Sequence, residues 1–185
     1  RREERLQEVP VAVTAFSSQQ LEEANVTRLE NLGNIAPSLQ ITHTAGRANI
    51  PGFAIRGQRQ DSGFLTNDPS IGIYVAEAVQ ARVFGLAQSL FDLESIQVLR
   101  GPQGTLFGRN TTGGAILIQP RRPDLGEVNG YLTARVGNFD RFDLQGAVNL
   151  PLHDTVALRV AYNRTRRDGW VTNVVTGQRL NEEHT

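Results

Sequence analysis

The chain has 185 residues, enough for one or two domains, and its 19 basic residues balance 19 acidic ones. A neutral chain lacks the basic surface that a nucleic-acid-binding protein needs. Cysteine is absent and the three histidines are scattered, which excludes disulfides and thiol chemistry and predicts no metal site.

The N-terminal region predicts a short strand followed by a helix. Residues 9–14 are mostly apolar and predict the strand. Ser17 with Gln20 three residues later is a capping-box pattern, so we expect a helix over about residues 18–24.

A second helix is predicted directly downstream. Thr27 with Glu30 repeats the capping-box spacing. An apolar stripe follows at Leu29, Leu32 and Ile35, and the helix should end near residues 33–37, where glycine and proline interrupt it. We expect both helices to be scaffold.

Strands and one long polar loop are predicted next. Residues 39–43 alternate as a strand does, and a loop with glycine and proline leads to a second strand at 53–57. Residues 58–70 form a long polar loop, and such loops in compact domains are often functional. Residues 71–75 predict a further strand, and residues 85–90 a short helical turn.

The glycine-rich stretch 95–118 is the centre of the pattern. A short apolar run, residues 95–100, ends in Arg100-Gly101-Pro102. A link rich in glycine follows, and Gly113-Gly114 opens a second apolar run. This order is typical of a strand, a tight structured loop and a second strand.

From Tyr131 onwards, apolar and polar residues alternate over three segments separated by turns at 137–141 and 151–154. One face carries the apolar side chains Leu132, Ala134, Val136, Phe142, Leu144, Val148, Leu150, Val156, Leu158, Val160 and Tyr162. The other carries Tyr131, Thr133, Arg135, Asp143, Gln145, Asn149, Arg159 and Asn163. Segments of about ten residues with this period are typical of outer-membrane barrel strands around a water-filled lumen, although a soluble antiparallel sheet alternates in the same way.

Motifs that could carry chemistry lack a required residue. Gly108 and Gly113 have the spacing of a phosphate loop, but Gly114-Ala115 stands where lysine and a hydroxyl residue are needed. Residues 101–104 have the GXXG pattern of a KH domain without the basic residues that would grip a nucleic-acid backbone. No Ser/His/Asp or paired-carboxylate arrangement stands out. We therefore expect no enzyme activity, no cofactor and no nucleic-acid partner.

Taken in order, the motifs resemble those of one family. Residues 99–116, which run from Leu-Arg-Gly-Pro-Gln-Gly to Thr-Thr-Gly-Gly-Ala-Ile, closely resemble the plug domain of TonB-dependent outer-membrane receptors. The same is true of residues 9–17, 55–57, 68–75 and 90–94, and residues 137–173 resemble the first barrel strands. Two places depart from the family pattern: Gln97, where glutamate is frequent, and Ala76-Glu77, where Asp-Gly is frequent.

The resemblance implies a fold in two parts. Residues 1–122 would form an α+β plug domain, and residues 123–185 the first three or four antiparallel strands of a transmembrane β-barrel. The complete barrel would have about 22 strands, as outer-membrane transporters with a plugged lumen do. So few strands cannot close in lipid, and methionine is absent, so we expect a fragment of a longer chain.

The resemblance also implies a function. We expect the N-terminal part of a receptor for active uptake of a scarce nutrient, such as a ferric siderophore or cobalamin, with the plug gating the barrel lumen. It would lie in the outer membrane of a Gram-negative bacterium, with its N-terminus in the periplasm. The implied partners are TonB, through a box upstream of residue 1, the remainder of the barrel, and membrane lipid. The alternatives are an outer-membrane signalling or binding module without transport, and a soluble nucleotide- or RNA-binding domain.

Three groups of candidate site residues follow. Residues on the expected apical plug loops would face the nutrient: Arg47, Asn49, Gln58, Arg59, Asp61, Phe64, Asn67, Arg82 and Phe84. Arg56, Arg100 and Arg109 each stand where an apolar strand gives way to a loop, and we expect their guanidinium groups to latch the plug onto carboxylates of the barrel wall. The structural loop would be shaped by Gly101, Pro102, Gly104, Gly108, Gly113 and Gly114.

Overall fold

The computed structural model describes residues 12–44, 47–59, 68–81, 89–177, 179–180 and 183–184, with the side chains of all but 43–44, 47–50 and 183–184. The chain divides into two compact units, Arg1–Arg121 and Arg122–Thr185. The first residues of the predicted N-terminal strand, most of the long polar loop and most of the helical turn at 85–90 lie outside the described residues.

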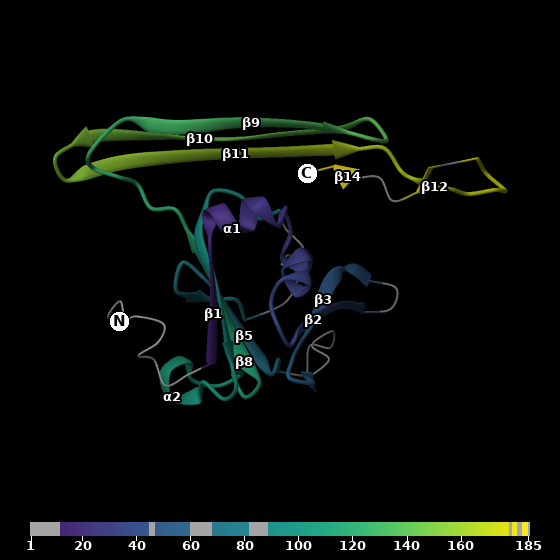
Figure 1. Cartoon of the computed structure of the whole chain (residues 1–185), viewed down its shortest axis with the longest axis horizontal. Coiled ribbons are helices and arrows are strands. Elements are labelled where there is room, and N and C mark those ends of the chain that lie inside the picture. The colour runs from purple at the N-terminus through teal and green to yellow at the C-terminus, as the bar shows by residue number, and fades with distance from the viewer. Residues whose placement is uncertain are drawn as a thin grey trace. The chain divides into compact units, whose positions relative to one another are not determined.

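The first unit is built on a five-stranded sheet with strand order β1-β7-β8-β5-β6 (Figure 1). Its strands are β1 (Ala12–Ser17), β7 (Leu93–Arg100), β8 (Gly114–Pro120), β5 (Ile71–Val75) and β6 (Ala78–Val79). Neighbouring strands are antiparallel except β5 and β8, which run parallel. The end of β7 and the starts of β5 and β8 therefore lie at one end of the sheet, where the glycine-rich loop connects β7 to β8.

A smaller sheet of three antiparallel strands has the order β2-β3-β4. It contains β2 (Leu39–Thr44), β3 (Arg47–Ile55) and β4 (Gln58–Arg59). The predicted loop before residue 53 is wrong, because β3 begins at Arg47 and passes through Pro51. The pairing register shifts between His43, the partner of Pro51, and Thr44, and such an irregularity is a place where a strand tolerates proline.

The first predicted helix is confirmed as α1 (Ser18–Glu23). Its capping box forms as expected: the Ser17 hydroxyl accepts the backbone N–H of Gln20 at 3.3 Å, and the Gln20 side chain accepts the N–H of Ser17 at 3.0 Å. Among the described residues, no helix has the length and apolar character needed to cross a bilayer.

The second predicted helix is a 3₁₀ helix, η1 (Leu29–Asn34), and its capping box was wrongly placed. The capping residue is Arg28, whose backbone N–H is accepted by the Asn31 side chain at 3.1 Å. Leu29 and Leu32 are both buried. Their spacing of three suits a helix with three residues per turn, which explains why a stripe read as α-helical is 3₁₀.

The core of the first unit lies between the five-stranded sheet, the helices and the smaller sheet. Its fully buried side chains come from all three: Leu29, Leu32, Ile55, Ile73, Ile96, Val98 and Ile116. Full burial of each such side chain contributes roughly 1.5–3 kcal/mol, so this cluster fixes the frame on which the loops stand.

The second unit contains three long antiparallel strands, β9 (Asn129–Gly137), β10 (Arg141–His153) and β11 (Val156–Arg167), with the short β14 (Glu183–His184) beside β11. A separate hairpin pairs β12 (Val171–Thr172) with β13 (Arg179–Leu180). The predicted turn at 151–154 is wrong in extent, because β10 continues through Pro151 to His153. Here too the register shifts next to the proline.

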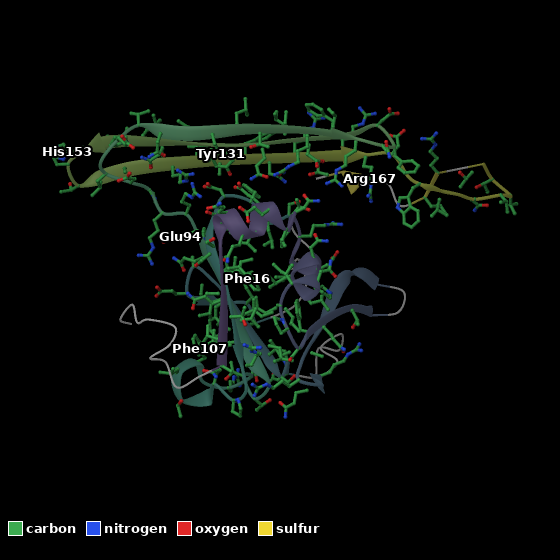
Figure 2. All side chains as sticks on the ribbon, viewed as in Figure 1. Phe16, Glu94, Phe107, Tyr131, His153 and Arg167 are labelled. Atoms are coloured by element: carbon green, nitrogen blue, oxygen red, sulfur yellow. The ribbon has the colours of Figure 1, made fainter. Side chains whose placement is uncertain are left out.

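The predicted alternation of β9, β10 and β11 is present, and its apolar side is the exposed one. Leu132 is 77% exposed and Val136 82%, and Val156, Leu158 and Val160 are also exposed. On the polar side, Asp143 and Asn149 are buried. Figure 2 shows the side chains along these strands, with Tyr131 and Arg167 labelled.

Candidate functional site

The glycine-rich loop between β7 and β8 is a closed, hydrogen-bonded unit. Gly101 N–H donates to the Gly113 carbonyl at 3.0 Å, and Gln103 N–H donates to the Thr111 carbonyl at 2.9 Å. The β7–β8 ladder thus continues two steps into the loop. Gln103 and Thr111 are 4% and 1% exposed, so the base of the loop is shielded from solvent.

A single helical turn, α2 (Gly104–Phe107), forms the far end of the loop (Figure 1). The N–H groups of Leu106 and Phe107 both donate to the Gln103 carbonyl. Gly108 ends the turn with a φ of 78°, and its carbonyl accepts the Thr111 hydroxyl at 2.7 Å. The expected tight loop therefore contains a short helix and is braced internally.

The glycine at the start of β8 cannot be replaced without strain. Gly114 has a φ of 153°, and a Cβ atom there would collide with the Leu99 carbonyl oxygen. The predicted loop residues are placed as follows: Gly101 and Pro102 after β7, Gly104 at the start of α2, Gly108 after α2, and Gly113 and Gly114 at the entry to β8.

Tyr74 on β5 fastens the loop to the sheet, a role that the sequence analysis missed. Its hydroxyl donates to the Phe107 carbonyl at 2.8 Å, and its ring lies 5.0 Å from the Phe107 ring (Phe107 is labelled in Figure 2). Gly72 makes room for this arrangement, since a Cβ there would lie 2.6 Å from Thr111 and 2.8 Å from Tyr74. The available signal was a tyrosine on a buried strand, because a buried tyrosine hydroxyl usually has a partner.

The three arginines expected to form a latch all belong to this end of the first unit. Arg100 Nη2 donates to the Thr14 hydroxyl of β1 at 2.9 Å, while its Nε is buried with no hydrogen-bond partner among the described residues. The Arg56 Nη1 atom lies 3.9 Å from the position that a Gly101 Cβ would take. Arg56 and Arg109 are exposed. None of the three forms an ion pair with another described residue.

The residues expected to face a nutrient are only partly described. Arg47 and Asn49 lie on β3, and their side chains are outside the described set. Gln58 and Arg59 are exposed on β4, paired with Ile55 and Ala54. The remaining candidates lie outside the described residues: Asp61, Phe64, Asn67, Arg82 and Phe84.

The charged groups with binding chemistry at this end of the first unit are the arginine side chains. Guanidinium groups are permanently charged and bind carboxylates through paired N–H groups. Within the described part of the chain, no three His, Asp or Glu side chains gather where they could hold a metal ion. The braced loop thus carries one exposed guanidinium group, that of Arg109, and the guanidinium group of Arg56 lies near Gly101.

Curated relatives similar to this chain are receptors and transporters. The pesticin receptor of Yersinia pestis is 31% identical over 171 residues, which are 90% of this chain and 24% of the relative. The vitamin B12 transporter of Vibrio vulnificus is 25% identical over 171 residues, which are 90% of this chain and 27% of the relative. The chain thus spans about a quarter of the length of these relatives.

Solved structures and a family match agree with these relatives. The ferric yersiniabactin uptake receptor from Yersinia pestis superposes with a TM-score of 0.79 and 30% identity, over 93% of this chain and 27% of that one. The ferripyoverdine receptor of the Pseudomonas aeruginosa outer membrane shares the fold, with a TM-score of 0.73 and 15% identity over 90% of this chain and 22% of that one. Residues 5–115 match the TonB-dependent Receptor Plug Domain family. The chain therefore belongs to the TonB-dependent receptors, with a plug domain followed by antiparallel barrel strands.

Proposed function

We propose that this chain is the plug and the first wall strands of an outer-membrane receptor that imports a ferric siderophore under the control of TonB, with the plug gating the lumen. The observation that carries the proposal is the likeness of the chain to the ferric yersiniabactin uptake receptor, at a TM-score of 0.79 over 93% of the chain.

The exposed apolar stripe of the second unit supports a membrane location. On β10 the stripe runs from Phe142 to Leu152, and both residues are exposed. Ten residue steps at about 3.3 Å cover roughly 33 Å along the strand. A barrel strand tilted by about 40° converts this length to roughly 25 Å across the membrane, the height of the apolar band of outer-membrane barrels.

The three arginines of the plug end support a gating role. Arg56, Arg100 and Arg109 would hold the closed plug against carboxylates of the barrel wall, as a releasable latch. None of the three forms an ion pair with another described residue, and Arg56 and Arg109 are exposed, which supports a role in binding such partners. The nutrient would contact the apical loops, including Gln58 and Arg59.

Uptake by the full-length receptor tests the proposal. The receptor is expressed in a Gram-negative host that lacks its own siderophore receptors, and radioactive iron is supplied as ferric yersiniabactin. We expect iron to accumulate in the cells, and to stop accumulating when TonB is deleted or the proton gradient is collapsed.

A parallel arm with labelled cobalamin separates two substrate classes, since one relative is a vitamin B12 transporter. Import of cobalamin alone would keep the transport proposal and replace its substrate. Failure to import either compound, in cells whose outer membrane contains the folded receptor, would contradict the proposal.

A further inference from the structure

Asn149 on β10 is a buried amide that holds residues 124–127, near the start of the second unit. It is 0% exposed. Its Oδ1 accepts the backbone N–H of Asp124 at 2.8 Å, and its Nδ2 donates to the carbonyls of Asp124 and Glu127, each at 2.8 Å. All three partners are backbone atoms of the segment that leads into β9.

This set of bonds requires an amide of this length. Aspartate would keep the acceptor but lose both donors, and leucine would leave one N–H and two carbonyl groups without partners. Unmet polar groups in a buried place are costly, so the segment is fixed to β10 as long as Asn149 is present. The Asp124 carboxylate accepts the N–H of Gly126 at 2.9 Å, which shapes the same segment into a local turn.

The other side of the connection is tied to the first unit. The backbone N–H of Arg121 donates to the Asp92 carbonyl at 2.9 Å, and Arg121 Nη2 donates to the Ser18 hydroxyl at 3.1 Å. Only Arg122 and Pro123 separate this residue from Asp124. Proline fixes its own φ and restricts the residue before it, so this connection is stiff as well as short. Three Cα steps of about 3.8 Å limit the distance between Arg121 and Asp124 to about 11 Å.

We propose that Asn149 is a positioning residue for transport. By anchoring the connecting segment to the wall strand β10, it leaves only three residue steps between the anchored Asp124 and Arg121 while the plug rearranges. Movement of the plug is then confined to its other strands, and the plug returns to one place after each passage of nutrient. This inference rests on the proposed transport function.

Hydrogen exchange in the full-length receptor tests the anchor independently of transport. In Asn149→Leu, the amides of residues 124–128 should exchange about tenfold faster or more, because three hydrogen bonds are lost. Asn149→Asp keeps the acceptor for the Asp124 N–H but sets a carboxylate oxygen against the two carbonyl oxygens, so it should also raise exchange in a folded receptor. Asn129→Leu is the matched control, since Asn129 is directly opposite Asn149 on β9 and has no hydrogen bond to the segment. Wild-type exchange at residues 124–128 in Asn149→Leu would overturn the anchor.

Uptake then tests positioning, with whichever of ferric yersiniabactin or cobalamin the wild-type receptor imports. Asn149→Leu and Asn149→Asp should bind the compound with wild-type affinity and lose most of the uptake rate, while Asn129→Leu keeps it. Faster exchange with an unchanged uptake rate would overturn the positioning role. If the wild-type receptor imports neither compound, the proposed function fails, and the exchange result still decides whether the anchor exists.

Discussion

The largest sheets of the two units share the two-residue period of β-structure but bury opposite kinds of residue. In the first unit, Ile96 and Ile116 are 0% exposed. In the second unit, the apolar Leu132 and Val136 are 77% and 82% exposed, while the polar Asn149 is 0% exposed. The period therefore sets which residues share a face, and the surroundings decide which face is covered.

The buried polar residues show how the second unit tolerates this arrangement. The Asp143 Oδ2 atom accepts a hydrogen bond from Arg141 Nε at 2.8 Å and forms an ion pair with its Nη2 at 2.8 Å, while the Asp143 Oδ1 atom is buried with no hydrogen-bond partner among the described residues. Asn149 satisfies its whole amide on backbone groups. Polar groups that lose contact with water need such partners. In the first unit, a buried polar side chain is satisfied within the glycine-rich loop: Thr111 is buried, and its hydroxyl donates to the Gly108 carbonyl.

The largest expected effect comes from truncating the core of the first unit. Ile116→Ala should lower the free energy of unfolding of the plug by about 2–5 kcal/mol, because it removes buried methylene groups and leaves a cavity. Val136→Ala, on the exposed apolar face of the second unit, should cost less than about 1 kcal/mol. Native-state hydrogen exchange of the full-length receptor in lipid measures both. Equal costs would mean that the two apolar faces are not in different surroundings.

An arginine introduced on β11 should destabilise the protein slightly less than the core truncation does. Its cost should depend on which of two adjacent residues, and so which face of the strand, carries it. Val160→Arg places a cation near the middle of the apolar stripe and should cost roughly 2–4 kcal/mol in a lipid-embedded barrel. Ala161→Arg makes the same addition on the polar face and should cost well under half as much. Reversible unfolding in lipid vesicles compares the two variants, and a larger cost for Ala161→Arg would invert the assignment of faces.

The strands whose extent was predicted wrongly from the sequence are strands that contain a proline. Residues 71–75 and the alternation of β9 to β11 were predicted because their patterns are local and uninterrupted. Pro51 and Pro151 were read as parts of loops, yet each lies inside a strand. Both stand beside a shift in pairing register, where the missing N–H of proline is tolerated. The irregularity is a property of the paired strands, and no single strand's sequence shows it.

The site was predictable only as far as its residues are neighbours in the chain. The glycine-rich loop was identified because its residues form one continuous motif. Tyr74 was missed because its partner, Phe107, is 33 residues away, and the anchor at Asn149 was missed because Asp124 is 25 residues away. Such pairs are set by how strands are ordered in the sheet, which local patterns do not reveal.

Removing the hydroxyl of Tyr74 should loosen the attachment of the glycine-rich loop to strand β5. Tyr74→Phe keeps the ring contact with Phe107 and removes one hydrogen bond, so the expected cost is about 0.5–1.5 kcal/mol. Exchange should rise across residues 101–113 and stay unchanged across β9 to β11. Tyr131→Phe, in the second unit, is the control. A rise spread over both units would show that the hydroxyl does not act on the loop alone.

The smallest expected effect concerns hairpin turns, which carry backbone strain in both units. Ala76 and Glu77 turn β5 into β6 with φ of 48° and 68°, and Phe139 and Asp140 have φ of 61° and 50° in the turn between β9 and β10. A left-handed conformation costs a residue other than glycine roughly 1–2 kcal/mol, and the greater freedom of glycine in the unfolded chain costs about 0.5–1 kcal/mol.

Ala76→Gly should therefore stabilise the plug by about 0.5 kcal/mol. Ala78→Gly, in the adjoining strand, should destabilise it by a similar amount, because no left-handed strain is relieved there. Unfolding of the full-length receptor, followed by exchange of β5 and β8, gives both signs, and a loss of stability in Ala76→Gly would show that this turn is not strained.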